Sequence, residues 1–126
     1  MIVSTGIDII EIKRLTASIQ RYGSHFLDRV YTAREQQAAP NSELVRGAYF
    51  AGRWAVKEAV SKALGTGIGA SCAMTDVEIT NDAAGAPVLT LHGAARKTAA
   101  ERGIARFHIS ISHEREYAIG QAIAEA

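Results

Sequence analysis

Two carboxylates and a lysine stand out in this sequence as groups that could do chemistry. Asp8 lies within the apolar segment 2–10, where a carboxylate loses hydration and needs a cation or several donors as partners. Glu58 lies in a segment with helical periodicity, and Lys62 follows it at the i+4 position on the same helical face. Mg²⁺ is usually held by one or two carboxylates together with waters and substrate phosphates. Asp8 and Glu58 are therefore candidate metal ligands.

Each carboxylate also has a simpler interpretation. Asp8 could be a capping or turn carboxylate, and Glu58 with Lys62 could form an ordinary surface ion pair. Neither residue taken alone decides between the simple and the functional interpretation, so both stay open at this point.

Further positive charge and a glycine-rich loop accompany these residues. Arg53, Lys57 and Lys62 lie on the same predicted helix as Glu58, and Gly65-Thr-Gly-Ile-Gly69 follows directly. Cations and exposed backbone N–H groups suit phosphate, although a single glycine-rich loop is a weak signal. The loop is not a Walker A loop, and it follows a helix instead of opening one, unlike a dinucleotide fingerprint. We expect a ligand that carries phosphate.

A third polar set is expected on one face of the strand 106–112. Its alternation places Phe107, Ile109 and Ile111 on one face and His108, Ser110 and Ser112 on the other, and the run ends at His113. The polar face could hydrogen-bond a ligand, or it could simply face solvent. A serine hydrolase is disfavoured, because no G-x-S-x-G elbow occurs.

Hydrophobic periodicity predicts the elements that must position these side chains. The order is a strand, four helices, a hairpin, a helix and two strands. Their ranges are 2–10, 11–22, a short helix capped by Ser24, another capped by Thr32, 43–64, 75–80, 87–91, 93–102, 106–112 and 117–124. The glycine at position 65 should end the longest helix. We expect a single α+β domain over residues 1–126, with a mainly antiparallel sheet and a long central helix.

The composition excludes several classes of protein. A net charge of +1 is unlike that of a general nucleic-acid coating protein, and no apolar run is long enough to span a membrane. The first residues lack the basic and apolar regions of a signal peptide. A single cysteine, Cys72, excludes an intramolecular disulfide and a cysteine-based zinc site. We expect a soluble cytoplasmic protein that binds neither nucleic acid nor membrane.

The apolar residues are numerous but small. The hydrophobic fraction is 48%, yet 23 of these residues are Ala and only eight residues of the chain are aromatic. A stripe of Ala48, Ala51, Ala55 and Ala59 on the long helix should let another backbone approach closely. Because a small domain buries a modest share of its surface, we expect self-association or a large ligand to complete the core.

Three segments together resemble one known family. Gly6-Ile-Asp-Ile-Ile-Glu-Ile-Lys-Arg14 resembles its N-terminal G-x-D-x-x-x-x-x-R motif, and residues 50–63 resemble its F-x-x-[RK]-[WF]-x-x-K-E-A-x-x-K-A signature. His108-Ile-Ser-Ile-Ser-His113 is similar to its C-terminal strand motif. The family is the phosphopantetheinyl transferases, whose fold is then expected, and the short length resembles the holo-acyl-carrier-protein synthase type.

The resemblance implies a group-transfer reaction in fatty acid biosynthesis. The 4′-phosphopantetheine arm of coenzyme A would move to a serine of apo acyl carrier protein, leaving adenosine 3′,5′-bisphosphate. Asp8 and Glu58 match the Mg²⁺ ligands, and Lys62 matches the lysine at the pyrophosphate, so these three residues are the expected catalytic set. Either Glu58 or a water molecule at the metal could take the serine proton, and the sequence does not choose between them.

The resemblance also implies binding residues and an assembly. Arg53 and His108 match positions at the nucleotide's phosphate, and the loop with Gly65 and Gly67 matches part of the coenzyme A wall. The short members of the family are homotrimers whose active sites are shared between neighbouring subunits. A single subunit should therefore be inactive.

The partner protein is expected on the helix that follows the first strand. Arg14 and Arg21 match the basic surface that receives the acidic acyl carrier protein. Such charges would steer the partner mainly through the association rate.

Two positions depart from the family pattern. Longer members carry D-x-E at the metal, whereas position 10 here is Ile10, so water should complete the metal shell. Ala86 stands where many relatives have a basic residue in the hairpin turn, which removes one contact to coenzyme A. The alternative function is a non-catalytic nucleotide-binding module, which would have no need of Asp8 and Glu58 as a pair.

Overall fold

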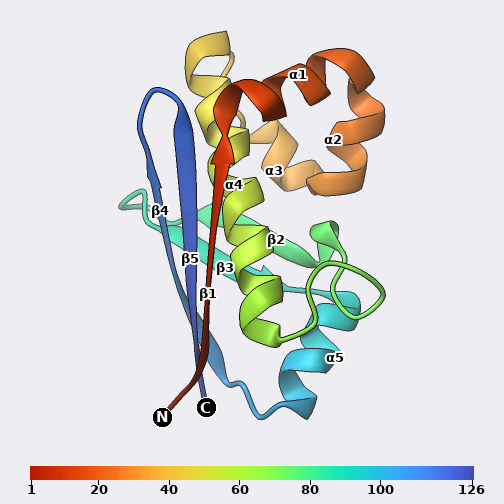
Figure 1. Ribbon diagram of the computed structural model, residues 1–126, viewed down its shortest axis with the longest axis vertical. Coiled ribbons are helices and arrows are strands. Elements are labelled where there is room, and N and C mark those ends of the chain that lie inside the picture. The colour runs from red at the N-terminus through yellow and green to blue at the C-terminus, as the bar shows by residue number, and fades with distance from the viewer.

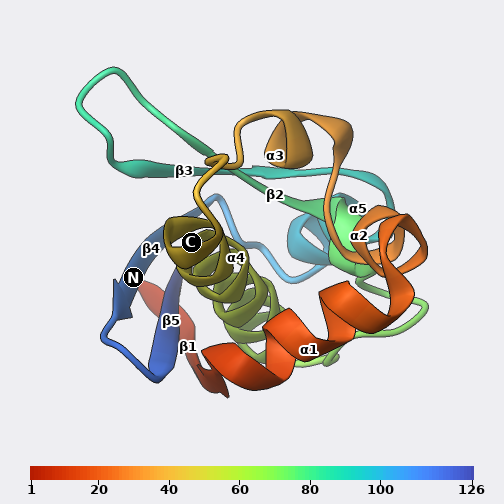
Figure 2. The ribbon, with the colours of Figure 1, turned by 90° about the horizontal axis from the view of Figure 1, so that it is seen from above.

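One long helix forms the centre of the fold in the computed structural model, which describes all residues 1–126 (Figure 1). This helix, α4 (Glu43–Leu64), contains no proline, and its many alanines offset two internal glycines. It ends as predicted at Gly65, which adopts the left-handed conformation with φ 82°. A three-stranded sheet covers one side of α4, and a β-hairpin and the other helices cover the remaining sides (Figure 2).

The three-stranded sheet joins the two ends of the chain. Its strands β1 (Ile2–Glu11), β5 (Tyr117–Glu125) and β4 (Arg106–His113) are antiparallel in the order β1-β5-β4. The register places Asp8 opposite Gly120. The two termini lie side by side (Figure 1), and Ala126 N donates a hydrogen bond of 2.9 Å to Met1 O.

Small residues let this sheet lie directly on α4. Ala55 and Ala59 are fully buried, and a Cβ at Gly6 or Gly120 would overlap the α4 backbone. The close approach predicted from the alanine stripe is therefore confirmed. The facing strands contribute to it as well, because β1 and β5 carry glycines where they touch α4.

The remaining elements enclose the other sides of α4. They are α1 (Ile12–Tyr22), α2 (Ser24–Val30), α3 (Ala33–Gln37), a 3₁₀ turn (Met74–Asp76), the antiparallel hairpin of β2 (Val77–Asn81) and β3 (Pro87–Leu91), and α5 (Gly93–Glu101). The α+β class and the order of elements are confirmed, although the strands form two separate sheets. Ser24 begins α2 but does not cap it, because the cap position is Gly23.

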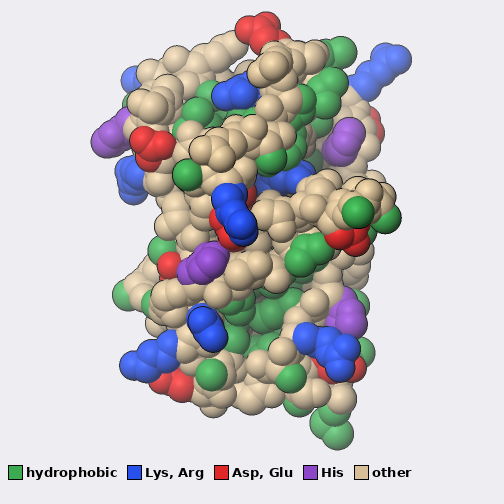
Figure 3. Space-filling view, turned by 180° about the vertical axis from the view of Figure 1, so that it is seen from behind, with side chains coloured by type: hydrophobic (Ala, Val, Ile, Leu, Met, Phe, Trp, Pro, Cys, Tyr) green, Lys and Arg blue, Asp and Glu red, His purple; other side chains and the backbone are tan.

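The outer face of the three-stranded sheet exposes large apolar side chains. Ile7 and Ile9 of β1 are 61% and 60% exposed, and Val3, Tyr117 and Ile119 are also exposed. By contrast, positive and negative side chains are interspersed on the face of the molecule seen in Figure 3. None of the helices is both long and apolar enough to cross a membrane.

Candidate functional site

The carboxylate of Asp8 meets a cation from α4. Asp8 lies on the face of β1 that is turned toward α4, as does the buried Gly6 two residues earlier. Lys62 Nζ lies 3.1 Å from Asp8 Oδ1 and donates a second hydrogen bond of 2.8 Å to Ile7 O. The lysine side chain is nevertheless 51% exposed, so its ammonium group can exchange these partners for a ligand.

Glu58 lies one turn before Lys62, and its carboxylate has no hydrogen bond or ion pair within the chain. Partial burial raises the pKa of Glu58 first, the negative charge of Asp8 raises it further, and Lys62 partly lowers it. Two neighbouring carboxylates, one of which is harder to ionise because of the other, fit a divalent cation, which would stabilise both charges. The three predicted catalytic residues Asp8, Glu58 and Lys62 are thus brought together from β1 and α4.

Few side chains near Asp8 and Glu58 could serve as metal ligands. Nowhere do three or more His, Cys, Asp or Glu side chains form a cluster that could hold a metal ion. Two carboxylates suit Mg²⁺, because this ion keeps waters and takes substrate phosphate oxygens as its other ligands.

Lys57 does not supply charge to a phosphate, contrary to the expectation from its place on the helix. Its side chain is fully buried on the opposite side of α4, where Nζ donates to Glu35 Oε1 at 2.8 Å and to Met74 O at 3.0 Å. It also donates to Val77 O. Burial lowers the pKa of Lys57, while the charge of Glu35 partly restores it.

The glycine-rich loop does not present the free N–H groups that were expected. The N–H of Gly65 donates to Lys62 O, and those of Thr66 and Gly67 donate to Ser61 O, so they cap the end of α4. Gly67 has a positive φ of 66°, a conformation that favours glycine. The loop can therefore form a wall beside Lys62, but not a phosphate cradle made of these amides.

Arg53 lies apart from the carboxylates, in a pocket of about 310 Å³. Its guanidinium carbon is 3.9 Å from the centroid of the Tyr49 ring, and Nη2 donates to Asn81 Oδ1 at the end of β2. Arg53 is only 8% exposed, and its Nε is buried without a hydrogen-bond partner. A guanidinium that lines a pocket and has no carboxylate partner can bind an anionic ligand.

The two histidines of β4 lie on opposite faces of the sheet. His108 is on the outer face, where Nε2 lies 3.1 Å from Glu125 Oε1, so a single chain brings it neither to Arg53 nor to Asp8. His113 lines the pocket of Arg53 together with Tyr49 and Asn81. The alternation of β4 could have identified His113, because odd positions face α4. The sequence offered no comparable signal for Tyr49 or Asn81.

The predicted carrier-protein residues lie on α1. Arg14 and Arg21 are one heptad apart on the same side of the helix, and both are exposed. Neither forms an ion pair within the chain; Arg21 lies 5.3 Å from the ring centroid of Tyr22. Their charges are therefore free to meet a partner.

Comparisons with known proteins identify the family of this chain. A family model described as "ACPS: 4'-phosphopantetheinyl transferase superfamily" matches residues 4–122. A curated holo-[acyl-carrier-protein] synthase from Solidesulfovibrio magneticus is 44% identical over 125 residues, covering 99% of both chains. The crystal structure of holo-[acyl-carrier-protein] synthase from Neisseria meningitidis has a TM-score of 0.90 at 33% identity and covers 100% of both chains.

A third relative was solved with a bound ligand. The Bacillus anthracis holo-(acyl-carrier-protein) synthase, in complex with CoA (3',5'-ADP), has a TM-score of 0.84 at 36% identity, covering 100% of this chain and 98% of that one. Because the family match spans nearly the whole sequence and full-length relatives share the fold, the chain belongs to the 4′-phosphopantetheinyl transferase superfamily.

Proposed function

We propose that this protein is a holo-acyl-carrier-protein synthase. It transfers 4′-phosphopantetheine from coenzyme A to a serine hydroxyl of apo acyl carrier protein and releases adenosine 3′,5′-bisphosphate. The observation that carries the proposal is the meeting of Asp8, Glu58 and Lys62 at the junction of β1 and α4. This arrangement occurs in a chain that aligns over its full length with curated synthases.

We assign Mg²⁺ as the cofactor and Asp8 with Glu58 as the residues that would hold it. When bound, the ion supplies Lewis-acid stabilisation of negative charge on diphosphate oxygens. The closeness of the two carboxylates supports this choice, because the charge of Asp8 raises the pKa of Glu58 and a bound cation would offset that repulsion.

The chain's own residues then have defined tasks in the transfer. The serine oxygen forms a bond to the phosphorus that carries pantetheine, and the bond from that phosphorus to the bridging oxygen of the diphosphate breaks. Lys62 stabilises the bisphosphate leaving group, because its ammonium lies beside Asp8 and stays half exposed. Either Glu58 or a water molecule would accept the serine proton.

We propose the pocket of Arg53 as the place of the nucleotide's phosphate. Its unpartnered guanidinium nitrogen supports this assignment, and His113 joins it in the same pocket. His108 remains a second proposed phosphate contact, and its place on the outer sheet face would require it to act across a subunit boundary.

We further propose a homotrimer in which neighbouring subunits complete each site. Two features support it: the apolar outer face of the three-stranded sheet, and the separation of Arg53 from the Asp8 cluster within one chain. Replacing Ile7 and Ile9 by Lys should yield folded monomers by sedimentation and abolish transfer. Fully active monomers would contradict the shared site.

We place the acyl carrier protein on α1, close to the reacting groups. Arg14 follows Asp8 by six residues, and Ile12 N donates 2.8 Å to Glu116 O, which fixes the junction of β1 and α1. An acidic partner held by Arg14 and Arg21 would therefore have its serine near the metal side of the site. The cytoplasm is the location we propose for this reaction.

A non-catalytic nucleotide-binding module is the alternative, and one experiment decides between them. Apo acyl carrier protein is incubated with coenzyme A, Mg²⁺ and this protein, and its mass is then measured. A gain equal to one phosphopantetheine group identifies the enzyme. Tight binding of coenzyme A without any mass gain identifies the binding module.

A further inference from the structure

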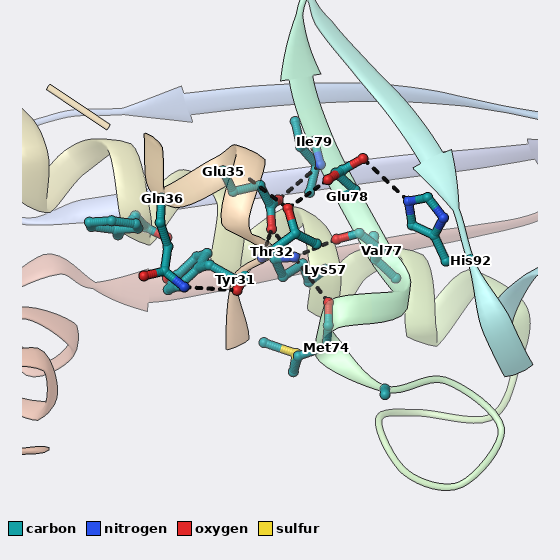
Figure 4. A network of polar contacts seen from close by, with 12 residues as sticks. Tyr31, Thr32, Glu35, Gln36, Lys57, Met74, Val77, Glu78, Ile79 and His92 are labelled. Atoms are coloured by element: carbon teal, nitrogen blue, oxygen red, sulfur yellow. Dashed lines mark hydrogen bonds and ion pairs between the residues drawn. The ribbon is translucent and has the colours of Figure 1, made fainter. Parts of the chain in front are cut away.

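Glu35 is the centre of a buried polar network on the side of α4 that lies away from the metal residues (Figure 4). We infer that Glu35 is a positioning residue that fixes the guanidinium of Arg53 for the nucleotide's phosphate. This inference rests on the proposed function, because it takes the Arg53 pocket to be the nucleotide site.

The side chain of Glu35 joins three elements. Oε1 accepts hydrogen bonds from Lys57 Nζ of α4 at 2.8 Å and from Thr32 N, the cap of α3, at 2.9 Å. Oε2 accepts one from Ile79 N of β2 at 2.9 Å. The carboxylate is fully buried, so all three bonds are protected from water and together fix α3 and β2 against α4.

Two links lead from Glu35 to Arg53. Through β2, Ile79 lies two residues before Asn81, whose side-chain oxygen accepts the hydrogen bond from Arg53 Nη2. Through α4, the hydroxyl of Tyr49 donates 2.6 Å to Glu35 O, and the ring of Tyr49 lies under the guanidinium at 3.9 Å. The link through β2 thus uses the carboxylate of Glu35, and the link through Tyr49 uses the backbone carbonyl of the same residue.

Arg53 depends on these two neighbours because it has no carboxylate partner of its own. A guanidinium held in advance binds phosphate without the cost of reorganising, and a displacement of about 1 Å can cost about two orders of magnitude in rate or binding. The network therefore sets the affinity for coenzyme A, while the metal side lies on the other face of α4.

The first test is Glu35→Gln, which keeps the size of the side chain and removes its charge. We expect the KM for coenzyme A to rise roughly tenfold while kcat at saturating coenzyme A changes less than about twofold. A loss of folded protein alone would lower kcat and leave KM unchanged. An unchanged KM in a folded Glu35→Gln protein would overturn the inference.

A milder pair of variants covers the case in which Glu35→Gln does not fold. Tyr49→Phe removes the hydroxyl that reaches Glu35 but keeps the ring under Arg53. Tyr31→Phe is its matched control, because the Tyr31 hydroxyl also donates to a backbone carbonyl, but to that of Phe50, at 2.7 Å. We expect a severalfold rise of the KM for coenzyme A in Tyr49→Phe only. Equal KM values for the two variants would overturn the inference.

Arg53→Ala separates this inference from the function on which it rests. A rise of its KM for coenzyme A larger than that of Glu35→Gln supports the positioning role. An unchanged KM overturns both the nucleotide assignment and the role of Glu35, whereas a mass gain on the carrier protein would still establish the transfer.

Discussion

Lys57 and Lys62 are five residues apart on the same helix, yet their surroundings are opposite. Lys57 is fully buried and donates to Glu35 and two backbone carbonyls. Lys62 is half exposed and has one carboxylate and one carbonyl as partners. The charge of Lys57 therefore holds elements of the fold together. The charge of Lys62 stays accessible to a ligand.

The energetics of the two pairs differ accordingly. Breaking a buried ion pair by removing one partner leaves a charge without compensation and costs about 3–5 kcal/mol. An exposed pair is worth about 0–1 kcal/mol, because water replaces the lost partner. A residue type in a signature is thus not enough to assign a role, and burial decides what each lysine does.

The largest expected effect is on the exposed side. Asp8→Ala and Glu58→Ala should each reduce phosphopantetheine transfer by on the order of 10³-fold, because each removes a ligand of the charge-stabilising ion. Both proteins should remain folded by circular dichroism. Activity is measured as the mass gain of apo acyl carrier protein at saturating Mg²⁺.

Glu101→Ala is the matched control, because Glu101 forms a plain surface i,i+4 pair with Lys97 of the same helix, at 3.9 Å. Should Glu58→Ala be as active as Glu101→Ala, Glu58 would be an ordinary surface carboxylate and the metal assignment would be wrong.

The next effect separates the two lysines directly. Lys57→Met should lower the free energy of unfolding by about 3–5 kcal/mol. Lys62→Met should change it by less than about 1 kcal/mol while transfer falls strongly. Denaturant unfolding is measured at one protein concentration, because assembly contributes to stability.

A double variant sharpens this test. Replacing both Lys57 and Glu35 by Met removes the buried charges together, so part of the stability should return, although Thr32 N and Ile79 N lose their acceptor. If Lys57→Met and Lys62→Met destabilised the protein equally, burial would not distinguish the two sides of α4.

Much of the fold follows from the sequence, because its patterns are strong and local. The capping box of Thr32 and Glu35 was correctly predicted to begin a helix, and Gly65 was correctly predicted to end α4. The sequence could not show that the carboxylate of Glu35 would also accept hydrogen bonds from Lys57 and Ile79, because these residues are 22 and 44 positions away from Glu35.

The candidate site was predicted only in part, for the same reason. Asp8 and Lys62, two residues of the expected catalytic set, are in contact. Lys57 was wrongly grouped with the phosphate-binding cations, since helical spacing alone does not say which side of a helix is covered. The amides of the glycine loop were also expected to be free, but the end of a helix leaves carbonyls that such amides satisfy.

A smaller effect is expected on α1, at the proposed surface for the acyl carrier protein. Arg14→Glu should weaken binding of apo acyl carrier protein about tenfold, mainly through a slower association rate that depends on salt. The affinity for coenzyme A should be unchanged by calorimetry. Arg96→Glu on α5 is the control, because it makes the same charge change at an exposed position away from α1. Equal losses of carrier and coenzyme A binding in Arg14→Glu would refute this surface.

The smallest effect concerns the pH dependence of stability on the two sides of α4. The pKa of Glu58 is raised, mainly by burial and then by Asp8, so the ionised carboxylate destabilises the unliganded protein above that pKa. Glu58→Gln should therefore stabilise it at pH 7–8, by less than about 1 kcal/mol because the group is partly exposed. The gain should fade as the pH drops toward the ordinary value of 4.5.

Glu78, in the network around Glu35, should behave in the opposite way. Burial raises its pKa, but hydrogen bonds with Thr32 and His92 outweigh burial and lower it. Ionised Glu78 therefore stabilises the protein above the ordinary value of 4.5, and this contribution is lost as the pH falls through the lowered pKa. Glu78→Gln should destabilise at pH 7–8 and become neutral in acid. The free energy of unfolding of both variants is measured with denaturant from pH 4 to 8. If both substitutions changed it in the same direction at pH 7–8, ionised Glu58 and ionised Glu78 would not have opposite effects on stability.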